Sequence, residues 1–146
     1  MPRNTAGKED TMKRIVCLLL AALLAVSLTG CGRISSTLEI TCDTSQIYST
    51  AEIHDAMDVV KTHFCRHFDG CTMTALGYIG GEKKDYMDGF AEQYGVDEVI
   101  VLVSDFETGS SGGDGSLNPN DTYRSYKWIL LREKDGSWSH ADHGYG

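Results

Sequence analysis

Two histidines one helical turn apart are the first candidates for chemistry. His63 and His67 lie four residues apart, which puts both rings on one face of a helix, with Cys65 between them. Imidazole and thiolate are ligands that suit zinc, so the pair predicts a metal site that takes a third ligand from elsewhere in the chain. The alternative is that both histidines cover the edge of an apolar helix stripe.

A second candidate group lies near the end of the chain, at His140, Asp142 and His143. Alternation along a strand would place His140 and Asp142 on one face and His143 on the other. A His–Asp pair can act as general acid and base when it lies in a pocket that shifts the pKa. The alternative is a solvated strand end without a catalytic role.

The segment 105–121 combines carboxylates with glycines and serines. Calcium binds several oxygen ligands at once, and such a segment can supply them. The spacing differs from that of an EF-hand loop, so the alternative is a long connection between two strands. The candidate ligands are Asp105, Glu107, Asp114 and Asp121.

Cys31 closes a pattern that is typical of a lipid-attachment signal. Lys13 and Arg14 precede an apolar run from Ile15 to Leu28, and the small pair Thr29-Gly30 stands directly before the cysteine. The run is shorter than the roughly 20 apolar residues that a transmembrane helix needs.

We therefore expect residues 1–30 to be a cleaved signal peptide, with residues 1–11 upstream of an alternative start at Met12. Acyl chains on Cys31 would then hold the protein on the extracytoplasmic face of a cell membrane.

The remaining cysteines permit one short bridge. Cys65 falls late in a predicted helix and Cys71 opens the next predicted strand, so a disulfide could close this corner. Free buried thiols are the alternative, and Cys42 has no evident partner.

The charge balance excludes some partners. From position 31 onward the chain carries nine Lys/Arg against 19 Asp/Glu, a formal net charge near −10. Nucleic acid needs a basic face and is therefore not expected as a partner. Anionic lipid headgroups would likewise repel the domain.

Hydrophobic periodicity and turn residues indicate the elements that must position these side chains. Ser49 and Glu52 form a capping box, and apolar residues then recur every three or four positions to Phe68. Asp135-Gly136 predicts a two-residue hairpin turn. We expect a lipidated cysteine and flexible tether (31–48), followed by one domain (49–146). The expected elements of this domain are, in order, a helix (50–68), a strand (72–79), a helix (82–94) and strands at 99–103, 123–132 and 137–143.

This order, α-β-α-β-β-β, predicts an α+β fold in which an N-terminal helix packs on a curved, mostly antiparallel sheet. The chain resembles the cystatin-like, or nuclear-transport-factor-2-like, roll of small lipoproteins of Gram-positive bacteria. The resemblance implies a fold and a cellular location, and it implies no activity. It rests on the segments 48–53, 112–120, 128–132, 135–138 and 142–146.

Two functions from different classes follow. The first is a membrane-anchored, non-enzymatic binding module for a small ligand or an envelope protein, with no cofactor. The alternative is a small hydrolase or isomerase that uses His140, Asp142 or His143 inside the roll. An enzyme needs a deep pocket, so side chains of Tyr126, Trp128 and Trp138 filling the concave face would remove its site.

Overall fold

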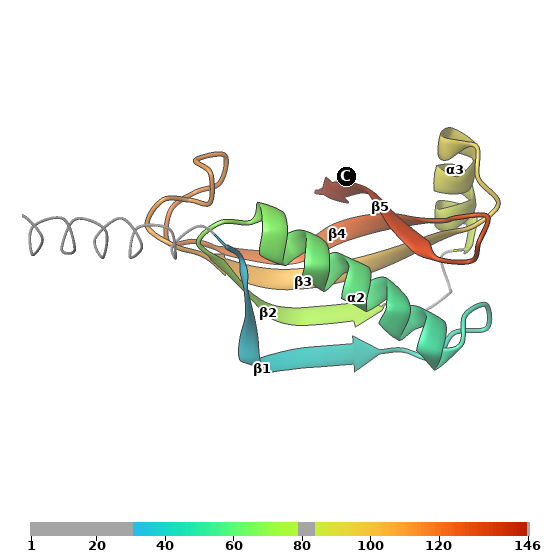
Figure 1. The fold of residues 1–146 in the computed structure, drawn as a ribbon, viewed down its shortest axis with the longest axis horizontal. Coiled ribbons are helices and arrows are strands. Elements are labelled where there is room, and N and C mark those ends of the chain that lie inside the picture. Colours follow the sequence, from blue (N-terminus) through green and yellow to red (C-terminus); the bar gives the residue numbers. More distant parts are fainter. Residues whose placement is uncertain (1–30, 79–83, 146) are drawn as a thin grey trace, which may run out of the picture. The chain divides into compact units, whose positions relative to one another are not determined.

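Five strands form one mixed sheet in which neighbours along the chain are also neighbours in space (Figure 1). The structure is a computed structural model that describes residues 31–78 and 84–145, so the predicted signal peptide lies outside the described residues. β1 and β2 run parallel, and the remaining pairings are antiparallel. The elements are β1 (Arg33–Cys42), α2 (Thr50–His67), β2 (Cys71–Tyr78), α3 (Lys84–Tyr94), β3 (Val99–Thr108), β4 (Thr122–Arg132) and β5 (Trp138–Gly144).

The fold is α+β, as expected, but the element order differs from the prediction because a strand precedes the first helix. Residues 33–34 and 39–42 pair with β2, from Arg33 opposite Thr72 to Cys42 opposite Tyr78, with a register shift between Ile34 and Glu39. The flexible tether predicted for residues 31–48 is therefore wrong. Its Ser and Thr content suggested a linker, whereas Thr and Ile also favour extended backbone.

Helix α2 begins and ends where the sequence predicted. The hydroxyl of Ser49 accepts a hydrogen bond from the Glu52 N–H, and the Glu52 carboxylate accepts one from the Ser49 N–H, which completes the capping box. Phe68 closes the helix, and its N–H donates to the carbonyl of Phe64. Gly70 then turns the chain with φ of +70°, a conformation that favours glycine.

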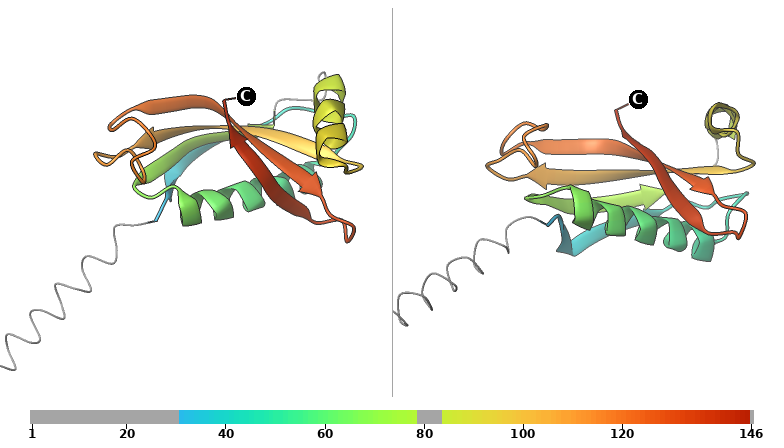
Figure 2. Two further views of the ribbon diagram at one scale, coloured as in Figure 1. Left: turned by 90° about the horizontal axis from the view of Figure 1, so that it is seen from above. Right: turned by 45° about the horizontal axis from the view of Figure 1, so that its top comes forward.

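The core lies between α2 and one face of the sheet. α2 crosses this face diagonally, as two further views show (Figure 2). Aromatic rings fill much of the interface: Trp128 and Phe106 from the sheet are fully buried beneath Phe64 from the helix. The apolar stripe of α2 consists of Ile53, Ala56, Met57, Val60 and Phe64, all buried.

A bulge in β5 changes which residues share a face. His140 pairs with Leu130 and Asp142 pairs with Ile129, so Ala141 is an extra residue without a partner in the ladder. An extra residue reverses the alternation beyond it. The prediction that His140 and Asp142 share a face is therefore wrong.

The β4–β5 turn is longer than predicted. The Glu133 N–H donates to the Ser137 carbonyl, and the Gly136 N–H donates to the Glu133 carbonyl, at 2.9 Å each. Residues 134–136 thus form the loop, with Gly136 at φ of +87°. A turn closed by a left-handed glycine is the usual form of a three-residue hairpin loop.

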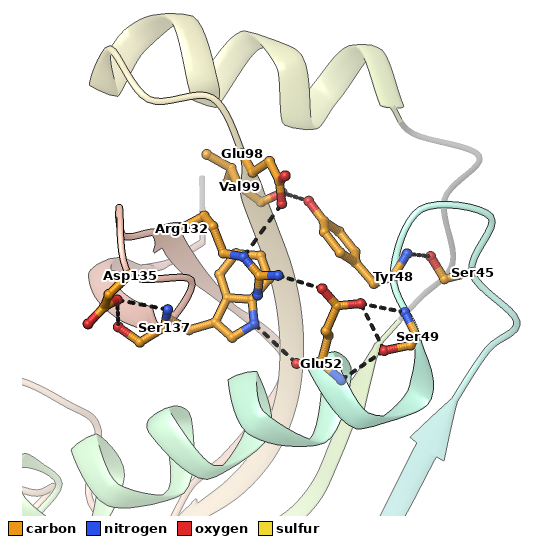
Figure 3. A network of polar contacts seen from close by, with 10 residues as sticks. Ser45, Tyr48, Ser49, Glu52, Glu98, Val99, Arg132, Asp135 and Ser137 are labelled. Atoms are coloured by element: carbon orange, nitrogen blue, oxygen red, sulfur yellow. Dashed lines mark hydrogen bonds and ion pairs between the residues drawn. The ribbon is translucent and has the colours of Figure 1, made fainter.

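A polar network ties the start of α2 to the strands (Figure 3). The Arg132 guanidinium pairs with the Glu52 carboxylate and lies 4.6 Å from the ring centre of Trp138. The Trp138 indole N–H donates to the Glu52 carbonyl at 3.1 Å. Tyr48 packs edge-on against Trp138, with ring centres 5.4 Å apart. This network fixes the end of α2 that lies away from His63 and His67.

The opposite end of α2 is fixed by backbone contacts. The Gly32 N–H donates to the Cys65 carbonyl at 3.1 Å, directly before β1 begins. The β3–β4 loop also lies at this end, where the Gly109 N–H donates to the Gly70 carbonyl at 3.0 Å.

No helix in the described part of the chain is long and apolar enough to cross a membrane.

Candidate functional site: a histidine cluster between α2 and β5

Four histidine rings meet where the last turns of α2 pass beside β5. His63 stacks on His140 with ring centres 3.8 Å apart, and on the same helix His67 lies 4.3 Å from His63. His143 Nδ1 lies 3.0 Å from His140 Nε2, within hydrogen-bond distance. The histidines of the two candidate groups that the sequence suggested separately thus form one cluster.

Three of these rings lie close enough together to be candidate ligands of one metal ion. One ring nitrogen each of His63, His140 and His143 lies within 4.8 Å of the other two. A tetrahedral ion with Zn–N distances of roughly 2.0–2.1 Å holds its nitrogens roughly 3.4 Å apart. The three nitrogens would therefore have to move closer together to bind a common ion.

His67 is a candidate fourth ligand. It lies one turn after His63 and contacts that ring, but its nitrogens fall outside the group of three. A structural zinc site is closed by four protein ligands, whereas a site with three protein ligands keeps one open position. The described geometry corresponds to three ligands with a neighbouring fourth.

The histidine cluster lies between a buried aromatic side chain of the sheet and solvent. Trp128 is fully buried, and its ring centre lies 5.2 Å from that of His143. On the solvent side, a hollow of about 350 Å³ is lined by Asp58, Val59, Thr62, His63, Arg66, His67 and His140. A smaller hollow of about 120 Å³ is lined by His67, His143 and residues of the β3–β4 loop. An ion therefore has a route to the rings from outside.

The environment favours the neutral form of His63, His140 and His143. Burial, and then the neighbouring rings of His140, His67 and His143, lower the pKa of His63 to about 4. Burial also lowers the pKa of His140 and of His143, although Asp142 opposes this shift in both. Neutral imidazole has the free lone pair that a metal ion needs. The site therefore competes weakly for protons and remains available to metals.

Asp142 is not part of the cluster. It lies across the bulge from His140, is exposed, and its carboxylate accepts a hydrogen bond from the His143 backbone N–H at 2.8 Å. The negative charge of Asp142 also raises the pKa of Tyr94 in α3, after burial of that hydroxyl. The predicted acid–base pair of His140 and Asp142 is therefore not assembled on one face.

The carboxylates of the acidic β3–β4 segment do not converge: among the described residues, the group of three or more neighbouring His, Cys, Asp or Glu side chains is the histidine set. Its carboxylates serve the local backbone instead. Asp105 accepts from the Ser125 N–H, and Asp114 accepts from the Ser116 N–H. Asp121 accepts from the Thr122 N–H, and Glu107 is exposed on β3. The prediction of a connection between strands fits this segment.

The predicted disulfide is not formed. Cys65 and Cys71 are free thiols, and the buried Cys71 Sγ lies 3.7 Å from the Asp69 carbonyl. Burial raises the pKa of the Cys71 thiol, which keeps it protonated. Cys65 is half-buried, and Cys31 and Cys42 are exposed.

The concave face of the sheet is filled. Trp128, Tyr126 and Trp138 are all buried there, with at most 8% of each side chain exposed. An enzyme site inside a roll would need this space. Two accessible hollows border the histidines at the edge of the helix instead, and a third, of about 170 Å³, lies away from them between α3 and the start of β3.

Sequence reasoning found every member of the cluster but not their meeting. The missing signal was the bulge at Ala141, which puts His143 on the same face as His140.

Comparison with known proteins adds no assignment, since no family model, no curated protein and no solved structure matches this chain.

Proposed function

We propose that this protein is a membrane-anchored, extracytoplasmic binding module whose ligand is a divalent transition-metal ion. The observation that carries the metal assignment is the convergence of His63, His140 and His143 from two separate elements, with ring nitrogens within 4.8 Å of one another. Helix and strand backbones hold such ligands more precisely than a loop does.

The donor set favours particular metals. Imidazole suits zinc, copper and nickel, whereas magnesium and calcium prefer oxygen ligands. No carboxylate joins the three nitrogens in the described ligand group. Zinc and copper are therefore the expected ions, with copper bound more tightly on general grounds.

The anchor is the second part of the proposal. The apolar run before Thr29-Gly30-Cys31 supports cleavage and lipid attachment at Cys31, which would place the domain outside the cytoplasm. The α+β architecture is compatible with the cystatin-like or nuclear-transport-factor-2-like roll that the sequence resembles. We propose that the chain is a lipoprotein of this type.

Binding is favoured over the alternative of a small hydrolase or isomerase. The buried aromatic side chains leave little room inside the sheet curvature, and Asp142 points away from the histidine face. A role in metal capture needs only the cluster and its solvent-side hollow.

The decisive experiment is a metal titration of the purified full chain. We expect Co²⁺ to give visible d–d absorption, and Zn²⁺ to displace it with one equivalent bound. His63→Ala, His140→Ala and His143→Ala should each weaken binding at least about tenfold, which corresponds to about 1.4 kcal/mol. His67→Ala should have a smaller effect.

His54→Ala is the matched control, because His54 is exposed on the same helix and is the one histidine outside the cluster. It should leave the affinity unchanged. Absence of binding for Zn²⁺, Co²⁺ and Cu²⁺, or an equal loss with His54→Ala, would exclude the metal site.

A further inference from the structure

The residue after Cys31 is built into the folded domain. Gly32 is buried, and its N–H donates to the Cys65 carbonyl at 3.1 Å. A Cβ on Gly32 would lie 2.3 Å from the Phe64 carbonyl oxygen and 2.9 Å from that of Phe68. The backbone here lies directly on the last turn of α2, and no side chain would fit between them.

The first two residues of β1 extend this fixation. Arg33 pairs with Thr72 and Ile34 with Met73, at the beginning of β2. The chain is therefore part of the sheet two residues after Cys31. By contrast, a flexible tether of 18 residues, as the composition suggested, would have an r.m.s. span of about 23 Å.

From this we infer that the C-terminal end of α2, with the turn at Gly70 and the β3–β4 loop beside it, is the surface that faces the lipid bilayer. The inference rests on the proposed lipid attachment at Cys31. One residue of backbone spans at most about 3.6 Å, so acyl chains on that residue cannot enter the bilayer without bringing this end of the domain to the headgroups.

The surface around the anchor is defined by contacts in the structure. The Gly109 N–H donates to the Gly70 carbonyl, which joins the β3–β4 loop to the end of α2. Ribbon views place this loop, the end of α2 and the start of β1 at the same end of the domain (Figure 1). The β4–β5 turn and the start of α2 lie at the other end, one helix length away, about 27 Å for 18 residues.

Charge alone would not choose this orientation. Arg33 and Arg66 are exposed next to the Gly32–Cys65 contact and can approach lipid phosphates. Asp114 and Asp121 on the neighbouring loop are also exposed and would be repelled by anionic lipids. The short covalent connection therefore determines the orientation, and it should persist in uncharged bilayers and at high salt.

The orientation brings one opening of the metal site towards the membrane. The smaller hollow, which His67 and His143 line, also contacts Gly113, Asp114 and Ser116 of the β3–β4 loop. The larger hollow opens along the side of α2, between Asp58 and His67. Metal exchange with the aqueous phase would then use the larger hollow.

The test uses full-length chain expressed in a lipid-modifying host and purified from membranes, with its intact mass measured first. The lipidated protein is placed in phosphatidylcholine nanodiscs that contain a small fraction of headgroup-nitroxide lipid. Amide line broadening should be strong for Gly70 and Gly112 and absent for Gly136. The pattern should not change with added salt.

A flexible Gly-Ser linker of about twelve residues, inserted between Cys31 and Gly32, is the matched control. It adds an r.m.s. span of about 19 Å and should abolish the difference between the two ends. The inference is overturned if Gly136 broadens as much as Gly70, or if the contrast survives the linker. A mass that shows no lipid refutes the anchor itself, whereas lipidated protein with the wrong broadening pattern refutes the orientation alone.

Discussion

The half-buried His63 combines two properties that favour metal binding. It stacks on His140 and contacts His67 beside a hollow that opens to the outside, and its pKa is lowered to about 4 by burial and by neighbouring histidines. The same desolvation that disfavours a proton leaves the ring ready for a metal ion. At acid pH the cluster should therefore lower the stability of the folded protein.

This predicts a pH-dependent stability. Between pH 6.5 and pH 4 the unfolded chain binds a proton at position 63 while the folded chain does not, so the free energy of unfolding should fall as the pH is lowered through this range. Above pH 6.5 both states are neutral and the contribution vanishes. Urea unfolding at pH 7 and pH 5 measures the effect. Both pH values lie above the pKa of most carboxyl groups, so carboxyl titration contributes little.

His63→Gln should reduce the loss of stability between these two pH values. A packing variant at the half-buried Leu38, Leu38→Ala, should lower stability by the same amount at both pH values, which separates titration from packing. If His63→Gln leaves the pH dependence as it was, the histidine is not its source.

Replacing Gly32 with alanine adds one methyl group and should lower the stability of the protein strongly. A Cβ there would meet two carbonyl oxygens of α2, which cannot move aside without breaking the last helical turn. Overpacking of this kind costs about 1–3 kcal/mol, and Gly32→Ala should lie at the upper end of that range.

Gly89 in α3 is the control, since nothing lies within 4 Å of its Cβ position and the residue is exposed. Gly89→Ala should stabilise the protein by about 0.5–1 kcal/mol because alanine is the better helix former. Urea midpoints compare the two variants. Equal midpoints for the Gly32→Ala variant and the parent protein would contradict the close contact with α2.

At the scale of elements, β1 is the clearest addition to what the sequence predicted. Leu38 is half-buried and packs against the core, whereas Ile40, two residues on, keeps 45% of its surface exposed. Leu38→Ala should therefore lower the free energy of unfolding by about 1–2 kcal/mol, less than a fully buried leucine would. Ile40→Ala should stay within about 0.5 kcal/mol of the parent protein. A disordered segment would show no effect in either variant.

Local signals predicted some elements well. The Ser49–Glu52 capping box fixed the start of α2, and the apolar run at 99–103 correctly indicated the central strand β3. These features depend on neighbours within a few residues, which a sequence displays directly. β1 was missed because its partner, β2, is distant in sequence and its exposed face is polar.

At the scale of the whole molecule, the candidate site depends on information that no single segment contains. His63 and His67 form a recognisable helical pair, and His140 and His143 a recognisable tail, yet only the packing of α2 beside β5 brings them together. The bulge at Ala141 adds a second condition, because regular alternation would have separated His140 from His143. Such a site can be predicted residue by residue, but its assembly requires the tertiary fold.

The parallel pairing of β1 with β2 has a consequence for the order in which the protein folds. The first strand cannot find its partner until the whole of α2 and most of β2 have left the ribosome or a translocation channel, since Cys42 pairs with Tyr78. Contacts this distant along the chain slow folding. In the proposed lipoprotein, the segment next to Cys31 would thus stay accessible to processing enzymes until the sheet closes over Gly32.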